Sequence, residues 1–369
     1  MIEIREVEDK RGLSEFIKLP FSLYKDNPYW VPPLISEMRN LLSEKNPFFE
    51  HAEAKLFLAF KEGKPVGRIA AIVDKNYIDF QKEKTGFFGF FECVEDFKVA
   101  ESLFSQAKEW LREKGMEHML GPMNPSTNDE CGFLLEGFDS SPMIMMPYTY
   151  KYYLDYAEGF GLRKAKDLFA YYRYTKDPPP EKLLRILNKV EKNKRIKVRP
   201  VNLKNLKEDA PLIKTVYNSA WAQNFGFVPL TDKEFDLMVK RLKPLVIPDF
   251  VPLAFVDGEI AGVALGVPDY NQVLKRLGGK LGPLEIVKLL WYSRKIRDVR
   301  LMVLGVRPEY RKMGIDALLY WEIFKTAEKR RYRGGELSWV LEDNYLTNRA
   351  IQMWGGKLYK KYRLYQMEI

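Results

Sequence analysis

The chain has 369 residues, of which 46% are hydrophobic and 30% charged, and its formal net charge is +10. This length predicts two domains, and this composition predicts folded domains with hydrophobic cores. No apolar run approaches the roughly 18–20 residues of a membrane-spanning helix, and the charged start of the chain does not resemble a signal peptide. We therefore expect no transmembrane segment and a cytoplasmic location.

Histidine and cysteine are rare, and their scarcity excludes several kinds of chemistry. Cys93, Cys131, His51 and His118 are the only residues of these two types, and none has the spacing of a metal-binding motif. Two cysteines do not make a disulfide scaffold. We therefore expect no metal site, and we assign the histidines no part in acid–base catalysis.

A pair of predicted strands joined by a tight turn occurs twice in the sequence. The residues Leu58-Ala59-Phe60, Gly63 and Gly67 recur 195 positions later as Leu253-Ala254-Phe255, Gly258 and Gly262. In both copies Glu-Gly or Asp-Gly stands between two apolar runs, which is typical of a β-hairpin. These matches indicate an internal duplication.

The elements after each hairpin follow the same order. Amphipathic helices are predicted at about 99–114 and 316–333, a strand follows each, and Gly161 and Gly356 precede the closing strands. The second half carries an insertion near 271–298, and the first half carries a longer connection near 125–151. We expect a mixed α/β fold present twice, with domains at 1–177 and 198–369.

Two loops of the first half bear on binding. Residues 92–97 hold three acidic residues and no glycine, so this loop is unsuited to a phosphate. Residues 124–130 are densely polar, and such loops often mark a binding site. The predicted substrate-binding residues are Asn124, Ser126, Asn128, Asp129 and Glu130, although these residue types also form self-capped turns.

A strongly basic segment follows the break at Asp177-Pro178-Pro179-Pro180. Residues 181–199 hold eight basic residues against two glutamates, and apolar residues recur there at near-helical spacing. We predict a basic linker helix over 178–197. It is either a solvated connector or a contact for the phosphates of a nucleic acid or of a nucleotide cofactor.

The insertion near 271–298 interleaves leucines with lysines and arginines. Packing against its own domain is one interpretation of this pattern. The others are a cap over an active-site cleft, a homodimer contact and a contact with a membrane surface. The pattern alone does not choose among them.

An anion-binding pattern follows in the second half. The apolar run 301–306 leads through a short turn into a predicted helix that begins near Gly314. Unpaired backbone N–H groups and the helix dipole favour an anion at such a helix start. Arg311 and Lys312 add positive charge, and Gly314 lets the backbone approach a phosphate closely.

The run from Val306 to Asp316, V-x-P-x-Y-R-x-x-G-x-D, resembles the acyl-CoA pyrophosphate loop of the GNAT superfamily of N-acetyltransferases. Arg311 and Gly314 occupy the first two defined positions of its Arg/Gln-x-x-Gly-x-Gly/Ala pattern, and Asp316 departs from the third. The whole chain, from D-N-P-Y-W-V-P-P at 26–33 to Y-R-L-Y at 362–365, is similar to bacterial tandem GNAT-like proteins. The resemblance implies two tandem GNAT-like acyl-CoA N-acyltransferase domains, of which the first has a degenerate cofactor loop.

The same resemblance implies a set of donor-binding residues. In the GNAT fold two parallel strands part, and the pantetheine arm of the donor pairs with their backbone. The residues implied to bind acetyl-CoA or another acyl-CoA are Leu304, Val306, Arg311, Lys312, Met313, Gly314, Ile315, Asp316, Asn344 and Asn348. The two asparagines also suit simple helix capping.

Catalytic groups are less clearly indicated. Transfer to an amine needs one group that removes a proton from an ammonium of pKa about 10 and another that protonates the leaving thiolate. Ile351 stands where many GNAT enzymes have a tyrosine. Glu342 and Tyr345 are then the nearest candidates for base and acid.

We therefore expect an N-acyltransferase that moves an acyl group from acyl-CoA to a small-molecule or peptide amine bound between the two domains. One alternative is an aminoacyl transferase of the Fem type that uses charged tRNA, whose RNA the basic helix would contact. The other alternative is a GNAT-fold protein that has lost its chemistry and binds a ligand or a partner. Asp316 and Ile351 favour this last interpretation.

Overall fold

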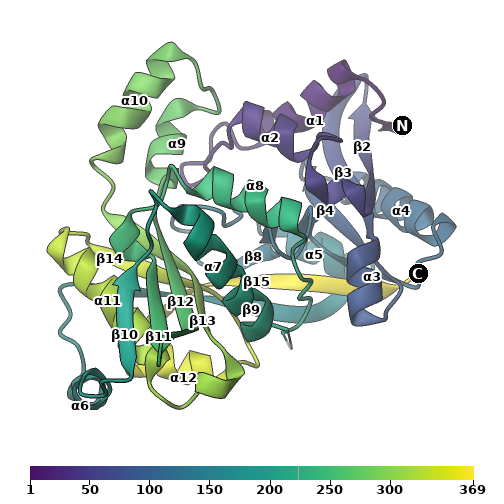
Figure 1. Ribbon diagram of the computed structural model, residues 1–369. Helices are drawn as coiled ribbons and strands as arrows, with labels where there is room; N and C mark the ends of the chain where they lie inside the picture. Colours follow the sequence, from purple (N-terminus) through teal and green to yellow (C-terminus); the bar gives the residue numbers. More distant parts are fainter. Residues whose placement is uncertain (223) are drawn as a thin grey trace. The chain divides into compact units, whose positions relative to one another are not determined.

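The computed structural model describes residues 1–222 and 224–369 (Figure 1). They divide into two compact units, neither of which is one continuous stretch of chain. Unit 1 contains Met1–Leu168, Asn271–Trp291 and Lys360–Ile369, and unit 2 contains Phe169–Tyr270 and Tyr292–Tyr359. Among the described residues, no helix combines the length and the apolar character needed to cross a membrane.

Unit 1 is a mixed sheet with helices. Its strands are β1 (Ile2–Glu6), β2 (Ala52–Lys61), β3 (Lys64–Asp74), β4 (Thr85–Cys93), β5 (His118–Gly121), β6 (Met123–Asn124), β7 (Glu130–Cys131), β8 (Phe133–Glu136), the first part of β9 (Arg163–Tyr174) and most of β15 (Lys357–Glu368). Its helices are α1 (Lys10–Leu23), α2 (Ile35–Leu41), η1 (Pro47–Glu50), α3 (Lys75–Gln81), α4 (Phe97–Glu113), α5 (Tyr152–Gly159), α9 (Asn271–Leu277) and α10 (Pro283–Ser293), whose last two residues fall in unit 2.

The sheet of unit 1 has the strand order β1-β2-β3-β4-β5-β15. All neighbours in it are antiparallel except β4 and β5, which are parallel. Helices pack on both faces of this sheet. Two consecutive residues of β3 show this, because successive side chains of a strand point to opposite faces. A Cβ atom at Gly67 of β3 would lie 2.7 Å from Leu103 of α4, whereas the next residue, Arg68, donates a hydrogen bond to the carbonyl of Phe16 in α1.

Unit 2 repeats this plan. Its strands are β10 (Ile196–Pro200), β11 (Pro252–Val256), β12 (Glu259–Pro268), β13 (Asp298–Val306) and β14 (Gly334–Leu341), with the remainder of β9 and the first residues of β15. Its helices are α6 (Glu181–Glu191), α7 (Leu206–Ala220), α8 (Asp232–Leu242), η2 (Pro248–Phe250), η3 (Pro308–Tyr310), α11 (Ile315–Lys329) and α12 (Tyr345–Met353). The sheet order is β10-β11-β12-β13-β14, and only β13 and β14 are parallel.

Local details of the two hairpins support the predicted duplication. Glu62 and Asp257, which begin the two turns, both have a left-handed backbone, with φ of 52° and 51°. Each hairpin also has a register shift at the same place, between Ala59 and Phe60 in one and between Ala254 and Phe255 in the other. The mixed α/β fold in two tandem copies, predicted from the sequence, is therefore confirmed.

The repeated glycines have a packing reason. A Cβ atom at Gly67 would lie 2.9 Å from Val99 of α4, and one at Gly262 would lie 3.2 Å from Ile315 of α11. In both units the glycine allows the long helix to approach the sheet closely. This contact is made by α4 in unit 1 and by α11 in unit 2, and both helices lie close to their predicted bounds.

One of two expectations about connecting segments needs adjustment. The basic helix is shorter than predicted: α6 ends at Glu191, and Lys197 and Arg199 belong to strand β10. The alternation of Ile196 and Val198 with basic residues fits a strand better than a helix. The insertion near 271–298 is present and forms α9 and α10, where the first half has only the short helix α3.

Candidate functional site

The feature that stands out in unit 2 is a parting of two parallel strands. β13 and β14 pair from Asp298 opposite Gly334 as far as Leu301 opposite Leu337. Both strands then continue, to Val306 and to Leu341, but no further pairs between them are described. β13 stays paired on its other edge with β12 up to Val306. The edge of β13 that faces β14 therefore offers backbone N–H and C=O groups to a ligand.

A β-bulge explains why the strands part at this point. Leu265 of β12 pairs with Val303, but the next residue, Gly266, pairs with Leu301, so Met302 is an extra residue in β13. A bulge bends its strand and increases the local twist. The bend begins one residue after the last pair between β13 and β14, and Leu304 and Val306 are half-buried beyond it.

The open edge leads into a loop that suits an anion. After Val306 the chain makes the short helix η3, and Lys312 and Gly314 then have positive φ angles of 70° and 76°. Gly314 is the N-cap of α11, and no side chain of the described residues caps this end. The first N–H groups of a 15-residue helix thus point out of the loop with the positive end of its dipole.

The side chains of this loop lie as follows. Lys312 and Asp316 are exposed, so the Asp316 carboxylate is turned to solvent. Arg311 donates a hydrogen bond to the carbonyl of Ala220 at 3.2 Å. Met313 is half-buried and Ile315 is buried in the core, which together fix the loop.

Gly314 has a second reason to be glycine. A Cβ atom there would lie 2.6 Å from Cγ2 of Val190 in α6. The basic helix α6 therefore packs against the start of α11, with Leu183, Leu187 and Val190 in the shared core. Both the positive φ and this contact require glycine, whether or not a phosphate binds beside it.

A buried polar cluster lies where the strands part, and sequence analysis did not single it out. Arg300 of β13 pairs with Glu336 of β14, and their side chains approach to 3.6 Å. Arg300 is 4% exposed and Glu336 is 0% exposed. Arg300 Nε donates to Ser338 Oγ at 2.8 Å, and the Glu336 carboxylate accepts from the hydroxyls of Ser338 and Tyr359. The signal in the sequence was the presence of charged residues in two apolar strands, Asp298 and Arg300 in one and Glu336 in the other.

The predicted residues of α12 are engaged in local hydrogen bonds. Asn344 Oδ1 caps the helix by accepting from the N–H of Thr347 at 3.3 Å. The buried Asn348 donates to the carbonyls of Leu341 and Glu342 and accepts from the hydroxyl of Tyr171. Asn344 thus caps the helix, and Asn348 ties the end of β14 to α12.

The two predicted catalytic residues lie at the end of β14. Glu342 directly follows the strand and is half-buried, whereas Tyr345 is 77% exposed at the start of α12. Ile351, at the place of the GNAT tyrosine, is buried in the core. Of the two predicted catalytic side chains, the candidate base Glu342 is therefore the less exposed to solvent.

The equivalent place in unit 1 is closed by the chain itself. β4 and β5 pair as far as Phe87 opposite Leu120, and the following backbone stays in contact with β4. A Cβ atom at Gly89 would lie 1.7 Å from the carbonyl oxygen of Met123. Asn124 Oδ1 accepts a hydrogen bond from the N–H of Phe90 at 2.6 Å. The side chain of Asn124, a predicted substrate residue, thus bonds to the N–H of Phe90, which an open strand edge would leave available to a ligand.

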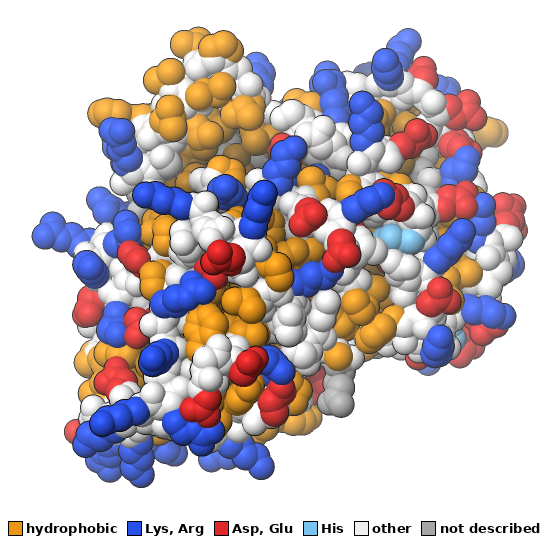
Figure 2. All heavy atoms as spheres, in the orientation of Figure 1, with side chains coloured by type: hydrophobic (Ala, Val, Ile, Leu, Met, Phe, Trp, Pro, Cys, Tyr) orange, Lys and Arg blue, Asp and Glu red, His pale blue; other side chains and the backbone are white. Residues whose placement is uncertain are grey.

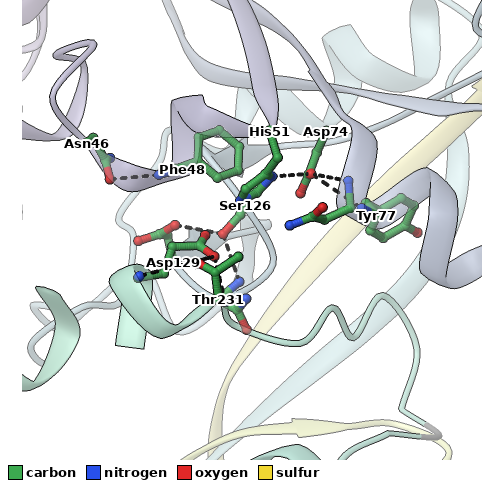
Figure 3. A network of polar contacts seen from close by, with 11 residues as sticks. Asn46, Phe48, His51, Asp74, Tyr77, Ser126, Asp129 and Thr231 are labelled. Atoms are coloured by element: carbon green, nitrogen blue, oxygen red, sulfur yellow. Dashed lines mark hydrogen bonds and ion pairs between the residues drawn. The ribbon is translucent and has the colours of Figure 1, made fainter. Parts of the chain in front are cut away.

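The other predicted substrate residues form a compact turn (Figure 3). The hydroxyl of Ser126 donates to Asp129 at 2.7 Å, and the N–H of Asn128 donates to the Ser126 oxygen at 3.1 Å. Glu130 pairs with Asn124 in the small sheet of β6 and β7. The polar cluster therefore has the self-capped geometry that such residue types allow.

Figure 3 also shows a histidine–aspartate contact in unit 1 that the sequence did not indicate. His51 Nδ1 lies 2.8 Å from Asp74 Oδ1, and Asp74 is buried. Asp74 also caps α3 by accepting from the N–H groups of Asn76 and Tyr77. The residues are 23 positions apart, on either side of the β2–β3 hairpin, so only the strand register brings them together.

A second buried carboxylate lies at the end of β4. Glu92 accepts hydrogen bonds from the hydroxyls of Tyr24 and Tyr153 at 2.7 and 2.8 Å, and Arg68 lies 3.9 Å away. Burial raises the pKa of Glu92 to about 6, although Arg68 and the two hydroxyls oppose the rise. Within the described residues, no group of three or more metal-ligating side chains is found.

Comparison with known proteins identifies the relatives of this chain. It is 35% identical over 373 residues to protein YghO of Escherichia coli, covering 99% of this chain and 95% of that protein. It is 33% identical over 374 residues to the bacterial ceramide synthase of Caulobacter vibrioides, covering 99% and 97%. The chain belongs to the family of these two proteins. No family model matches the sequence.

The fold has solved counterparts. A tandem GNAT protein from the clavulanic acid biosynthesis pathway superposes with a TM-score of 0.60 at 11% sequence identity, covering 100% of this chain and 98% of that one. At that identity the likeness shows the fold alone. It confirms the tandem GNAT fold that the sequence motifs predicted.

Proposed function

We propose that this protein is an N-acyltransferase whose acyl-CoA donor binds in unit 2. The observation that carries the proposal is the parting of β13 and β14 beside the uncapped start of α11. An extended pantetheine arm can pair with an open strand edge, and a pyrophosphate can accept from the N–H groups of a helix start. Leu304 and Val306 would supply the strand edge, and residues 311–316 would supply the loop.

We further propose that the acceptor is the amine of a long-chain molecule. A relative of this chain, identical at 33% of positions, is named bacterial ceramide synthase, and a ceramide is an N-acylated long-chain amino alcohol. The position of the acceptor remains the prediction made from the sequence, at residues 124–130. The hydrogen bonds within that turn would have to open for Ser126 and Asp129 to contact an amine.

The chemistry asks little of the protein beyond positioning and two proton transfers. The amine nitrogen attacks the thioester carbonyl carbon, a C–N bond forms, the C–S bond breaks and the thiolate takes up a proton. Glu342 remains the candidate to remove the ammonium proton. The buried pair of Glu336 and Tyr359 is a second candidate for proton exchange, because it lies beside the last paired residues of β13 and β14.

Calorimetric titration of the full chain with palmitoyl-CoA and acetyl-CoA tests the donor site. The variant Lys312→Glu reverses a charge in the loop, and we expect it to weaken binding roughly tenfold, equivalent to about 1.4 kcal/mol. Lys329→Glu is the matched control, since it reverses another exposed lysine, at the other end of α11. Wild-type protein that is folded but binds neither thioester would refute the proposal.

A further inference from the structure

Helix α10 presents its apolar side to solvent. None of its residues is buried. Its five most exposed apolar side chains are between 46% and 73% exposed: Leu284, Ile286, Val287, Leu290 and Trp291. At 100° per residue these five fall on one continuous arc of the helix, and Glu285, Leu289 and Tyr292 fall on the opposite side. Figure 2 shows this arc as a patch of hydrophobic side chains.

This orientation is the reverse of the usual one. Surface helices turn their apolar stripe to the core, as α4 does with Val99, Leu103 and Trp110. On α10 the apolar stripe is the most exposed part, and Leu281 just before it is also exposed. Exposed apolar patches of this kind mark surfaces that bind another body.

The segment that carries α10 is firmly attached to unit 1. Asn271 Nδ2 at the start of α9 donates to the carbonyl of Pro142 at 3.0 Å, and Lys275 donates to Ser141 Oγ at 3.1 Å. The carbonyl of Gly279 accepts from the N–H of Ile35 at 3.0 Å. Helix α9 and Gly279, which precede α10, are thus hydrogen-bonded to the rest of unit 1. The apolar stripe of α10 is therefore exposed on a segment whose base is fixed.

Charge distinguishes between the bodies that this patch can bind. Residues 271–291, the part of the insertion that belongs to unit 1, hold four basic residues and a single acidic one: Lys275, Arg276, Lys280 and Lys288 against Glu285. Two copies of a segment with this charge would repel each other across an apolar contact. A surface that is apolar within and anionic outside complements both the apolar stripe and the positive charge of this segment, and an anionic lipid bilayer has that structure.

We propose that α10 is a membrane-surface helix, which lies on an anionic bilayer with its apolar arc among the lipid chains and Lys288, beside that arc, at the headgroups. The proposal is independent of the acyl-donor site in unit 2, because binding to a bilayer needs no thioester. It adds a location to the proposed chemistry, because a protein bound to the bilayer would contact a long-chain acceptor that is dissolved in that bilayer.

Co-sedimentation of the full chain with lipid vesicles tests this proposal. One vesicle set contains phosphatidylethanolamine and phosphatidylglycerol, and the other contains neutral phosphatidylcholine. We expect binding to the anionic set, weaker binding to the neutral set, and weaker binding to the anionic set at high salt. The double variant Leu284→Glu/Val287→Glu should bind the anionic vesicles at least about tenfold less, because it places carboxylates on the inserted arc.

A matched double variant controls for the loss of exposed leucines in general. Leu184→Glu/Leu346→Glu changes two exposed leucines of α6 and α12, and it should bind vesicles as the wild type does. Quenching of tryptophan emission by brominated lipid gives a second readout, and the quenched part should be absent in Trp291→Phe. Circular dichroism confirms that each variant is folded.

Three results would overturn the proposal. The first is wild-type protein that stays in the supernatant with both vesicle sets. The second is a Leu284→Glu/Val287→Glu variant that sediments as the wild type does, which would place the contact elsewhere. The third is a dimer seen by light scattering that this variant dissociates, in the absence of vesicle binding, which would assign the apolar arc to a second copy of the chain.

Discussion

Each unit contains one pair of parallel strands at the equivalent place in its sheet, β4 and β5 in unit 1 and β13 and β14 in unit 2. The edge exposed where the strands part is open in unit 2 and covered by the chain in unit 1. In both units the first strand of the pair carries a bulge just after its last parallel pair, at Met302 in β13 and between Gly89 and Glu92 in β4. In unit 1 glycines at 89 and 121 let the chain after β5 lie directly against β4, and Asn124 bonds to the backbone of Phe90. One architecture thus gives either a ligand-accepting edge or a sealed one, and a few small residues beside the strands decide between them.

Each unit also places an arginine and a glutamate in the sheet near this point, with different partners. Arg300 and Glu336 lie on neighbouring strands, and Glu336 accepts from two hydroxyls. Arg68 and Glu92 pair across β3 and β4, at a longer distance of 3.9 Å. Burial raises the pKa of Glu92 to about 6, and burial lowers the pKa of Arg68. Arg68 therefore compensates the buried Glu92 carboxylate only in part.

The largest expected effect comes from breaking the pair in unit 2. Arg300→Met leaves Glu336 buried without its cation, and we expect the free energy of unfolding of unit 2 to fall by about 3–5 kcal/mol. Arg68→Met should cost unit 1 less, because Glu92 can take up a proton near its pKa of about 6. Hydrogen exchange of the two sheets at pH 5 measures both units in one sample. Equal losses in the two variants would remove the distinction between the pairs.

The pH dependence of unit 1 gives the next largest effect. The pKa of Glu92 is about 6 in the folded protein against 4.5 for the ordinary residue, so the folded state holds this proton more tightly. The free energy of unfolding should therefore fall by about 2 kcal/mol in total as the pH rises from well below 4.5 to well above 6, with about 1.3 kcal/mol of the fall between those two values. In Glu92→Gln, which keeps an acceptor for Tyr24 and Tyr153 but cannot titrate, this fall should be absent.

The matched control for that change is Glu95→Gln, which alters an exposed glutamate three residues further on. It should keep the full pH dependence of the wild type. Urea unfolding followed by hydrogen exchange in β4 measures the slope for all three proteins. A wild-type stability that is flat between pH 4.5 and 6 would contradict the assignment.

The smallest expected effect tests the closed edge itself. Asn124→Ala removes the acceptor for the N–H of Phe90, and unit 1 should lose about 1 kcal/mol. Asn124→Asp keeps a side-chain oxygen at the same place and should lose less. Neither variant should alter palmitoyl-CoA binding, because the donor site is proposed in unit 2. A gain or loss of thioester binding in Asn124→Ala would show that unit 1 also contributes to the donor site.

Local patterns predicted much of this fold. The paired turns at Gly63 and Gly258, the long helices α4 and α11 and the insertion before β13 follow from periodicity, turn residues and self-similarity. The end of α6 was misplaced because basic residues continue past Glu191, and charge does not distinguish an exposed helix from an edge strand. Only the alternation of Ile196 and Val198 carries that information.

The candidate site was predictable only in part, because its geometry depends on strand register. The loop at 311–316 and its helix start were visible as a motif. The pairing of Arg300 with Glu336 joins residues 36 positions apart, and the His51–Asp74 pair likewise depends on which residues of two strands lie opposite. The outward-facing arc of α10 was equally hidden, since an apolar stripe in a sequence does not state which side is covered.

The placement of the closing strand has a consequence for how the protein is made. Residues 360–369 complete the sheet of unit 1, where β15 pairs with β5 through Tyr365 opposite Gly121 and with β8 through Arg363 opposite Phe133. Nearly all of unit 2 is therefore synthesised before unit 1 can complete its sheet. More than two hundred residues must follow β5 before its partner strand β15 is made, and until then that edge of β5 is unpaired. Loss of the last ten residues should thus damage the N-terminal unit first, and a nascent chain stalled before β15 would expose β5 to chaperones.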